Sequence, residues 1–226
     1  MTLSRLGGWA AFTCGATYLF GFALLVTVLA PLGFGSNDVD PAAVVAFNAE
    51  TPGLLTLWNS LIYVLNALAL AVLVVALARR LEPVLPDWAS VSQALGLIWA
   101  ALVLGAGMVA NVALERADHL YATDPAAAAE LWTTLHAVEL GLGGGNEIAG
   151  GVWIGVVSLA ALRSRVLPLW VAALGLLTSA GGLATVFPPV GDVTGAIFGL
   201  GAIAWFLSVG AVLILARGSR PASAAA

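Results

Sequence analysis

The sequence predicts an all-α membrane protein, a polytopic bundle of six transmembrane helices with both termini in the cytoplasm. The first observation is composition: 61% of the 226 residues are hydrophobic and 9% are charged, whereas about 25% of the residues in an ordinary soluble domain are charged. The second is that apolar stretches long enough to cross about 30 Å of hydrocarbon as a helix recur along the chain. The third is that arginines gather at alternate ends of these stretches.

The apolar stretches define the predicted spans. Continuous runs of Leu, Ala, Val and Gly favour helices over a closed barrel, which shows alternating segments of about ten residues. The first run exceeds the roughly 7 to 15 apolar residues of a signal peptide, so we expect it to stay in the mature protein. The spans cover residues about 9–33, 54–78, 90–114, 131–162, 168–187 and 193–216, within one transmembrane domain over residues 1–226.

The arginines set the predicted orientation. Cytoplasmic loops carry an excess of positive residues, and seven of the eight basic residues fall on one side of the predicted spans. These are Arg5, Arg79, Arg80, Arg163, Arg165, Arg217 and Arg220, with Arg116 opposite. The absence of Lys beside abundant Ala, Gly and Arg is typical of bacteria with GC-rich genomes, so the predicted location is the bacterial cytoplasmic (inner) membrane.

A repeat relates the second and third spans to the fourth and fifth. Trp58 opens the second span between leucines, as Trp132 opens the fourth. Each span ends in arginines and leads into a Val-Leu-Pro-x-Trp turn, at residues 84–88 and 166–170. The pattern predicts two helical hairpins in the same orientation, a parallel repeat of the type found in transporters. Shared interfacial chemistry is the alternative explanation.

The fourth span is longer than the second, and the surplus coincides with the glycine-rich run at residues 141–147. Each glycine costs roughly 0.5 to 1 kcal/mol relative to alanine in a helix. Close helix packing is one explanation of the run. The other is a helix break that exposes backbone groups at membrane depth.

The second half of the chain resembles a known family. Gly151, Trp153 and Gly155, then Arg163, Arg165, Leu167, Pro168, Trp170 and Gly175, carry the resemblance. Over residues 140–215 the chain is similar to bacterial six-span proteins of domain of unknown function 4386. The resemblance implies a six-helix membrane protein of unassigned activity.

Glu147 is the clearest candidate for chemistry, because polar side chains at membrane depth are costly. Hydrocarbon favours the neutral form of a carboxyl group, and a neutral acid can donate a proton, relay one or bind a ligand. A carboxyl group paired with Asn or His on another helix is the alternative. Asn146 adjoins it as a candidate ligand contact.

Other polar side chains share helix faces. Asn59, Tyr63 and Asn66 follow steps of four and three, and either hydrogen bond between helices or form a polar cavity wall. His136 and Glu139 lie on the face of Glu147, and the turn after the third span is expected to bring further polar groups near them. These are Asn111, Glu115, Asp118 and His119. His119, His136, Glu115 and Asp118 are candidate metal ligands, a proton relay or solvated rim charges.

Three functions fit these residues. The leading hypothesis is binding or transport of a small or lipophilic ligand, with membrane lipid around the chain and a homodimer formed through glycine faces. The second is an intramembrane enzyme using Glu147 in a cavity lined by Trp99, Trp153 and Trp205, acting on a lipid or isoprenoid-like substrate. The third is a noncatalytic subunit of a membrane complex. The sequence leaves any cofactor unknown, and it contains no phosphate-loop or basic motif that would indicate a nucleotide or nucleic acid as partner.

Overall fold

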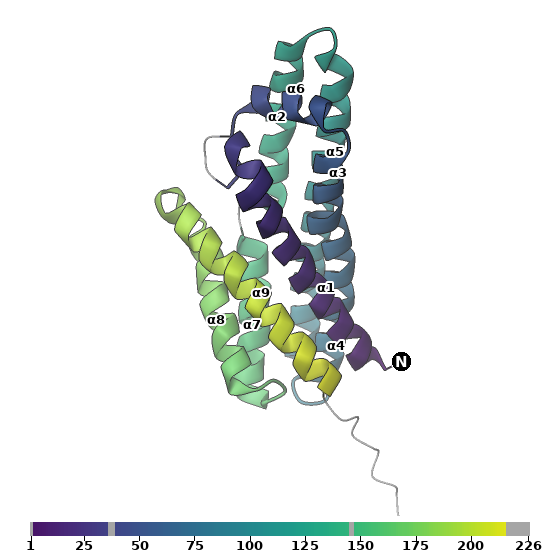
Figure 1. Cartoon of the computed structure of the whole chain (residues 1–226). Coiled ribbons are helices and arrows are strands. Elements are labelled where there is room, and N and C mark those ends of the chain that lie inside the picture. The colour runs from purple at the N-terminus through teal and green to yellow at the C-terminus, as the bar shows by residue number, and fades with distance from the viewer. Residues whose placement is uncertain (1, 36–38, 145–146, 216–226) are drawn as a thin grey trace, which may run out of the picture.

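The computed structural model describes residues 2–35, 39–144 and 147–215, and every regular element in these ranges is a helix (Figure 1). The α-helices are α1 (Leu3–Leu24), α2 (Pro41–Glu50), α3 (Leu54–Asn59), α4 (Asn66–Leu81), α5 (Pro86–Tyr121), α6 (Pro125–Glu139), α7 (Ile148–Ser164), α8 (Leu169–Ala184) and α9 (Gly191–Leu215). The π-helical turns are η1 (Leu25–Leu29), η3 (Ser60–Leu65) and η4 (Leu140–Gly144), and the 3₁₀ turns are η2 (Ala30–Leu32) and η5 (Pro188–Val190).

Among the residues that the structure describes, five segments are long and apolar enough to cross a membrane. They are Leu3–Leu32, Leu54–Leu81, Pro86–Tyr121, Pro125–Ser164 and Val193–Leu215. The predicted all-α membrane fold is confirmed at this level. The fifth predicted span corresponds to α8, which has 16 residues and is therefore shorter than the roughly 20 residues that cross a bilayer.

Two hairpins, α4–α5 and α7–α8, turn at the same end of the bundle, the lower end in Figure 1. Arg80 Nε donates to the carbonyl oxygen of Val166 at 2.9 Å, and the Arg163 guanidinium lies 4.5 Å from the ring centroid of Trp88. These contacts join the two Pro-Trp turns, so the repeated hairpins lie side by side with the same orientation. Ser4 Oγ donates to the carbonyl oxygen of Leu213 at 2.9 Å, which brings the start of α1 and the end of α9 together.

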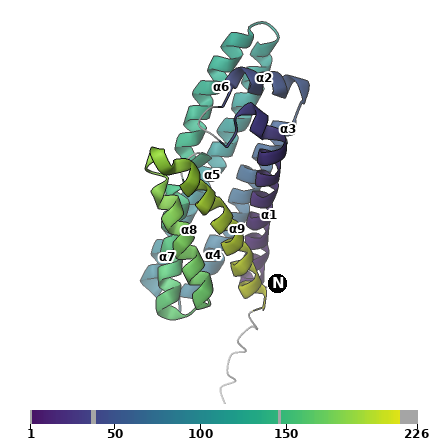
Figure 2. The same cartoon turned by 60° about the vertical axis from the view of Figure 1, so that its left-hand side comes forward.

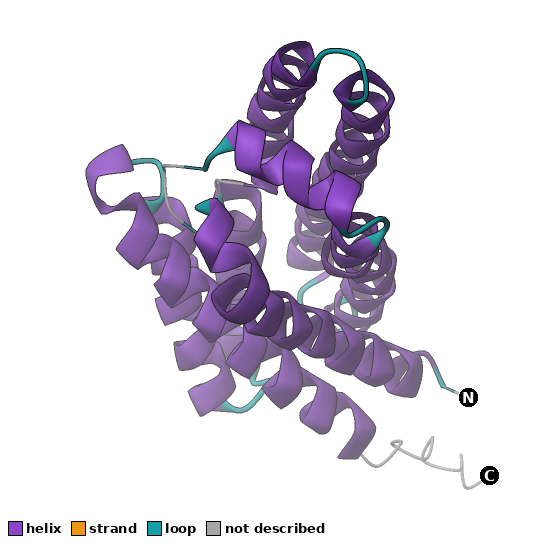
Figure 3. Cartoon of the chain, turned by 45° about the horizontal axis from the view of Figure 1, so that its top comes forward, coloured by secondary structure: helices purple, strands orange, loops and turns teal. Residues whose placement is uncertain are grey.

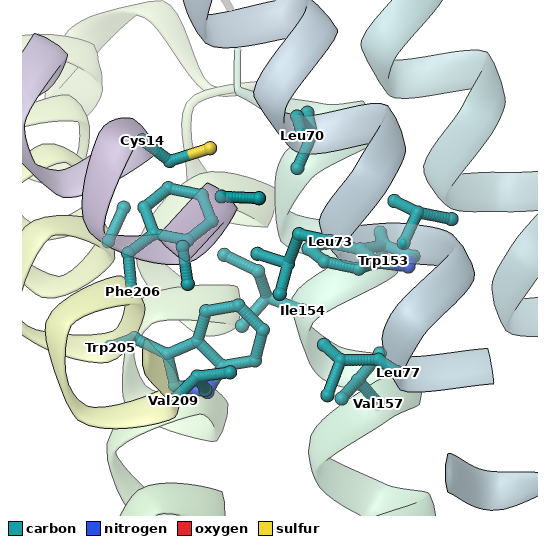
Figure 4. Packing of buried hydrophobic residues seen from close by; sticks show 14 of the residues in the cluster. Cys14, Leu70, Leu73, Leu77, Trp153, Ile154, Val157, Trp205, Phe206 and Val209 are labelled. Atoms are coloured by element: carbon teal, nitrogen blue, oxygen red, sulfur yellow. The ribbon is translucent and has the colours of Figure 1, made fainter. Parts of the chain in front are cut away.

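The core at this end is built mainly from aliphatic and aromatic side chains of six helices, α1, α4, α5, α7, α8 and α9 (Figure 4). Trp153 and Trp205 are fully buried, with ring centroids 5.6 Å apart, and Trp99 stacks on Phe206 at 6.2 Å. Trp99, Trp153 and Trp205 thus pack between helices. These buried ring contacts fix how α5, α7 and α9 pack.

The opposite end is dominated by the long α5–α6 hairpin, which extends past α7, α8 and α9 (Figures 1 and 2). Helix α2 lies across this hairpin (Figure 3). The Asp40 carboxylate accepts hydrogen bonds from the backbone N–H groups of Ala42 and Ala43, and Pro41 occupies the first turn. Asp followed by Pro is a helix-start signal, so a segment expected as a loop is helical. Val44, Trp58 and Trp132 belong to the apolar cluster beneath α2.

Candidate functional site

The fourth predicted span is interrupted where the glycines occur. Gly143 has φ 126°, a backbone conformation that residues with a side chain rarely adopt. Helix α7 then begins at Ile148, with Glu147 as its N-cap residue. The Glu147 N–H donates to Thr185 Oγ1 at 3.1 Å, and its carbonyl oxygen accepts from the Gly151 N–H at 2.8 Å. The glycine run therefore coincides with a break between two helices, as the second explanation predicted.

Close packing applies to the glycines that follow the break. A Cβ atom on Gly151 would lie 3.0 Å from Leu183 N and 3.1 Å from Ser179 O. A Cβ atom on Gly182 would lie 2.8 Å from the Glu147 carbonyl oxygen. All three are backbone atoms, which cannot move aside as a flexible side chain would. The backbones of α7 and α8 thus meet directly, and this contact fixes the position of Glu147.

A cavity of about 810 Å³ lies in the upper half of the bundle, between α1, η3, α6, the helix break and the start of α9. Ligand pockets in proteins usually measure about 300–1,000 Å³. The aromatic lining residues are Tyr18, Phe22, Phe34, Trp58, Tyr63 and Trp132. The polar lining residues include Asn59, Thr133, His136, Glu139, Glu147 and Thr185. The cavity is therefore large enough for a lipophilic molecule and has polar groups to orient it.

Glu139 is the centre of a polar network on one wall. The Tyr63 hydroxyl donates to Glu139 Oε1 at 2.7 Å, and His136 Nδ1 lies 2.6 Å from Glu139 Oε2. The Trp132 ring stacks on the His136 ring, with centroids 4.5 Å apart and planes 18° apart. Tyr63 reaches Glu139 because η3 packs tightly on α5 at Gly107. The Tyr63–Glu139 hydrogen bond therefore joins η3 to α6.

Glu147 lies on the cavity lining without such partners. Within the described parts of the chain its carboxyl group has no hydrogen-bond or ion-pair partner, although its backbone is well bonded. Tyr18 and Tyr63 line the same cavity. A polar group held at membrane depth without a partner is the arrangement expected of a ligand contact or a proton carrier.

Comparison with known proteins gives one family. Residues 13–218 match the family described as Domain of unknown function (DUF4386). The chain belongs to this family. The DUF4386 match is wider than the resemblance over residues 140–215, and it includes every residue that lines the cavity. No curated protein and no solved structure matches the chain.

The predicted ligand contacts of this DUF4386 chain divide into two groups. Asn59, Tyr63 and Glu139 line the cavity, as does the candidate acid Glu147. Asn66 does not: its Nδ2 donates to Thr17 Oγ1 at 2.7 Å and so joins α4 to α1, which is the helix-pairing alternative. Asn111 Nδ2 donates to Ser60 Oγ at 3.1 Å, outside this cavity. Asn146 lies outside the described residues.

The predicted metal ligands are not brought together. No group of three or more His, Cys, Asp or Glu side chains suited to a metal ion occurs among the residues that the structure describes. Glu115, Asp118 and His119 are exposed near the tip of the α5–α6 hairpin. His136 lies 11 residues beyond the start of α6 at Pro125, about 16 Å along the helix axis. The helices continue further than predicted, and this separates the two halves of the expected site.

The aromatic walls differ from the prediction. Trp99, Trp153 and Trp205 pack in the core instead of lining the cavity. Trp58 and Trp132, which open the second and fourth predicted spans, are buried and line it, and Phe34 contacts both rings edge-on at 5.5 and 6.3 Å. The sequence repeat could have identified these two tryptophans, because Trp58 and Trp132 occupy equivalent positions in its two halves. No sequence pattern marked Phe34 or the contributions of α1.

Proposed function

We propose that this DUF4386 protein binds a small lipophilic ligand inside the membrane and moves it between the bilayer and the opposite face of the bundle. The observation that carries the proposal is the cavity of about 810 Å³ with aromatic walls, a polar network and a carboxyl group that has no partner among the described residues. Apolar walls supply affinity for a hydrocarbon chain, while the few polar groups orient one end of it.

The packing of α1 against α9 supports access from the lipid. At the lower end the two helices touch, because a Cβ atom on Gly210 would lie 3.0 Å from the Gly8 carbonyl oxygen. Higher up, a Cβ atom on Gly199 would lie 2.8 Å from the Phe22 ring. Above that level, Cβ atoms on Gly191 and Gly195 would meet no atom within 4 Å. Both of these glycines line the cavity, so we propose the gap between α1 and α9 as the ligand's route.

The proposal includes a topology. We propose six spans, with α8 as the fifth, within one transmembrane domain over residues 1–226, and both termini on the cytoplasmic side of a bacterial inner membrane. The support is the arginine distribution and the contact between the two hairpin turns. The glycines expected to form a homodimer, such as Gly151 and Gly155, pack on α8 in the same chain. A dimer would therefore use another surface.

Filling the cavity is expected to exclude the ligand. Gly195→Leu adds a side chain where a Cβ atom meets nothing within 4 Å, so the fold should keep its stability while the cavity loses volume. The probes are dodecylamine and dodecanol carrying a diazirine, photolysed with the protein in phosphatidylcholine nanodiscs. We expect competable adducts on cavity peptides of the wild type, reduced about fivefold or more in Gly195→Leu because the added side chain removes apolar contact area.

Gly105→Leu is the matched control. A Cβ atom at Gly105 has one neighbour within 4 Å, a Leu142 methyl at 3.8 Å, and Gly105 does not line the cavity. Its labelling should equal that of the wild type. Adducts spread evenly over lipid-facing residues, with no enrichment at the cavity for either probe, would refute the proposed function.

An acid–base enzyme is the second candidate, and the hydrogen-bonded Tyr63–Glu139–His136 network favours it. Paired groups of this kind transfer protons in many active sites. An enzyme would change the mass of lipid or isoprenoid added to the nanodiscs. A binding protein or transporter would return it unchanged.

A further inference from the structure

We infer that the ligand is an organic cation, a lipophilic amine or quaternary ammonium compound whose head group binds between Glu147 and the Tyr63–Glu139 pair. This inference rests on the proposed function and specifies its ligand class. It is carried by the charges that line the cavity, by the partners that each has, and by the aromatic rings around them.

The charges on the lining are acidic. Its described residues include two carboxyl groups and one imidazole, and none of them is an arginine. All basic residues of the chain other than His are arginines. Arg80 and Arg163 contact Val166 and Trp88 at the hairpin turns, at the other end of the bundle. Arg116 is exposed on α5. A ligand cation therefore meets no like charge from a guanidinium at this site.

The two carboxyl groups, of Glu139 and Glu147, differ in the hydrogen-bond partners that the described residues give them. Glu139 receives the Tyr63 hydroxyl on one oxygen and His136 on the other. Glu147 has no such partner among the described residues, and it lies at the N-terminus of α7, where the helix dipole favours a negative charge. A buried carboxylate is costly unless it is paired. A ligand cation supplies the partner that the described residues do not.

The aromatic lining supports a cation over a neutral polar head. Organic cations bind to the faces of Trp, Tyr and Phe rings, which form the cages that hold quaternary ammonium groups. Tyr18 and Tyr63 line the same cavity as Glu147, where Trp58 and Phe34 also meet, with their ring planes at 75°. The hydrocarbon chain would then lie along Phe22, toward the gap between α1 and α9.

The test compares head groups at constant chain length. Diazirine-bearing dodecylamine, dodecanol and dodecanoate are photolysed with the full chain in phosphatidylcholine nanodiscs. Cavity adducts are normalised to adducts at Leu177 and Leu200, which are 63% and 60% exposed on the lipid-facing surface. The amine should label the cavity about tenfold more than the alcohol. Glu147→Gln should remove most of that preference and leave alcohol labelling unchanged. Glu130→Gln, an exposed carboxylate on α6 outside the cavity, should change neither.

Each outcome decides one proposal. Equal labelling by amine and alcohol, stronger labelling by the carboxylate, or an amine preference that survives Glu147→Gln would overturn the inference while leaving cavity binding intact. The absence of cavity labelling by all three probes would remove the proposed function itself. If Glu147→Gln fails to fold, which lost alcohol labelling would reveal, the amine-to-alcohol ratio of the wild type decides the inference alone.

Discussion

Replacing Gly182 by leucine is expected to lower the free energy of unfolding by about 3 kcal/mol, because extra atoms in a packed interior force the backbone apart. The nearest atoms to the added Cβ would include the Glu147 carbonyl oxygen at 2.8 Å and Gly151 Cα at 3.0 Å. Both belong to the backbone of the break and the first turn of α7. The substitution should therefore separate α7 from α8 and displace the acid at the same time.

The measurement is unfolding by SDS from mixed micelles, followed by tryptophan fluorescence. Gly105→Leu is again the control, since its Cβ would have 3.8 Å of clearance, and it should unfold like the wild type. Amine labelling of the cavity should also fall in Gly182→Leu under conditions where the protein is still folded. Equal stability of Gly182→Leu and the wild type would mean that α7 and α8 do not meet as described.

Glu139→Leu is the second substitution with a large expected effect. Glu139 is 7% exposed and accepts from Tyr63 while pairing with His136. The substitution leaves the Tyr63 hydroxyl and the His136 ring without their shared partner, and each buried polar group left unsatisfied costs about 1–3 kcal/mol. Tyr63→Phe removes one hydrogen bond and leaves the His136 pair intact, so it should cost about 1 kcal/mol.

Glu130→Leu, on the exposed side of the same helix, provides the matched control and should change stability little. The same SDS titration ranks the three variants. A Glu139→Leu protein as stable as the wild type would show that the network does not hold α6 against η3.

The sequence predicted the features that depend on local pattern. Hydrophobic length identified the membrane class, and the Val-Leu-Pro-x-Trp repeat identified both hairpins and their common orientation, which the Arg80–Val166 contact supports. The glycine run marked the break because glycine alone tolerates the φ of Gly143. Glu147 could be identified from the sequence as a candidate functional residue, because a carboxyl group at that depth is costly.

Other features depend on contacts between remote segments, and the sequence did not reveal them. The cavity wall formed by Tyr18 and Phe22 exists because α1 diverges from α9 above Gly199. The metal site was expected because the third and fourth spans were predicted to end nearer the membrane. In the structure α5 continues to Tyr121 and α6 begins at Pro125. The predicted ligands on α5 and His136 on α6 therefore lie at different heights along the hairpin.

Chemical access to position 147 tests the central claim, that Glu147 faces a cavity inside the bundle. Single cysteines at Glu147, Val157 and Leu177 would be treated in nanodiscs with neutral 2-hydroxyethyl methanethiosulfonate. The native Cys14 is fully buried and gives an unreactive background. Cysteine at position 147 should react about tenfold faster or more than at Val157, in the packed core, or at Leu177, on the lipid-facing surface. A rate at 147 equal to either reference would place the side chain in packed protein or in lipid and contradict the account.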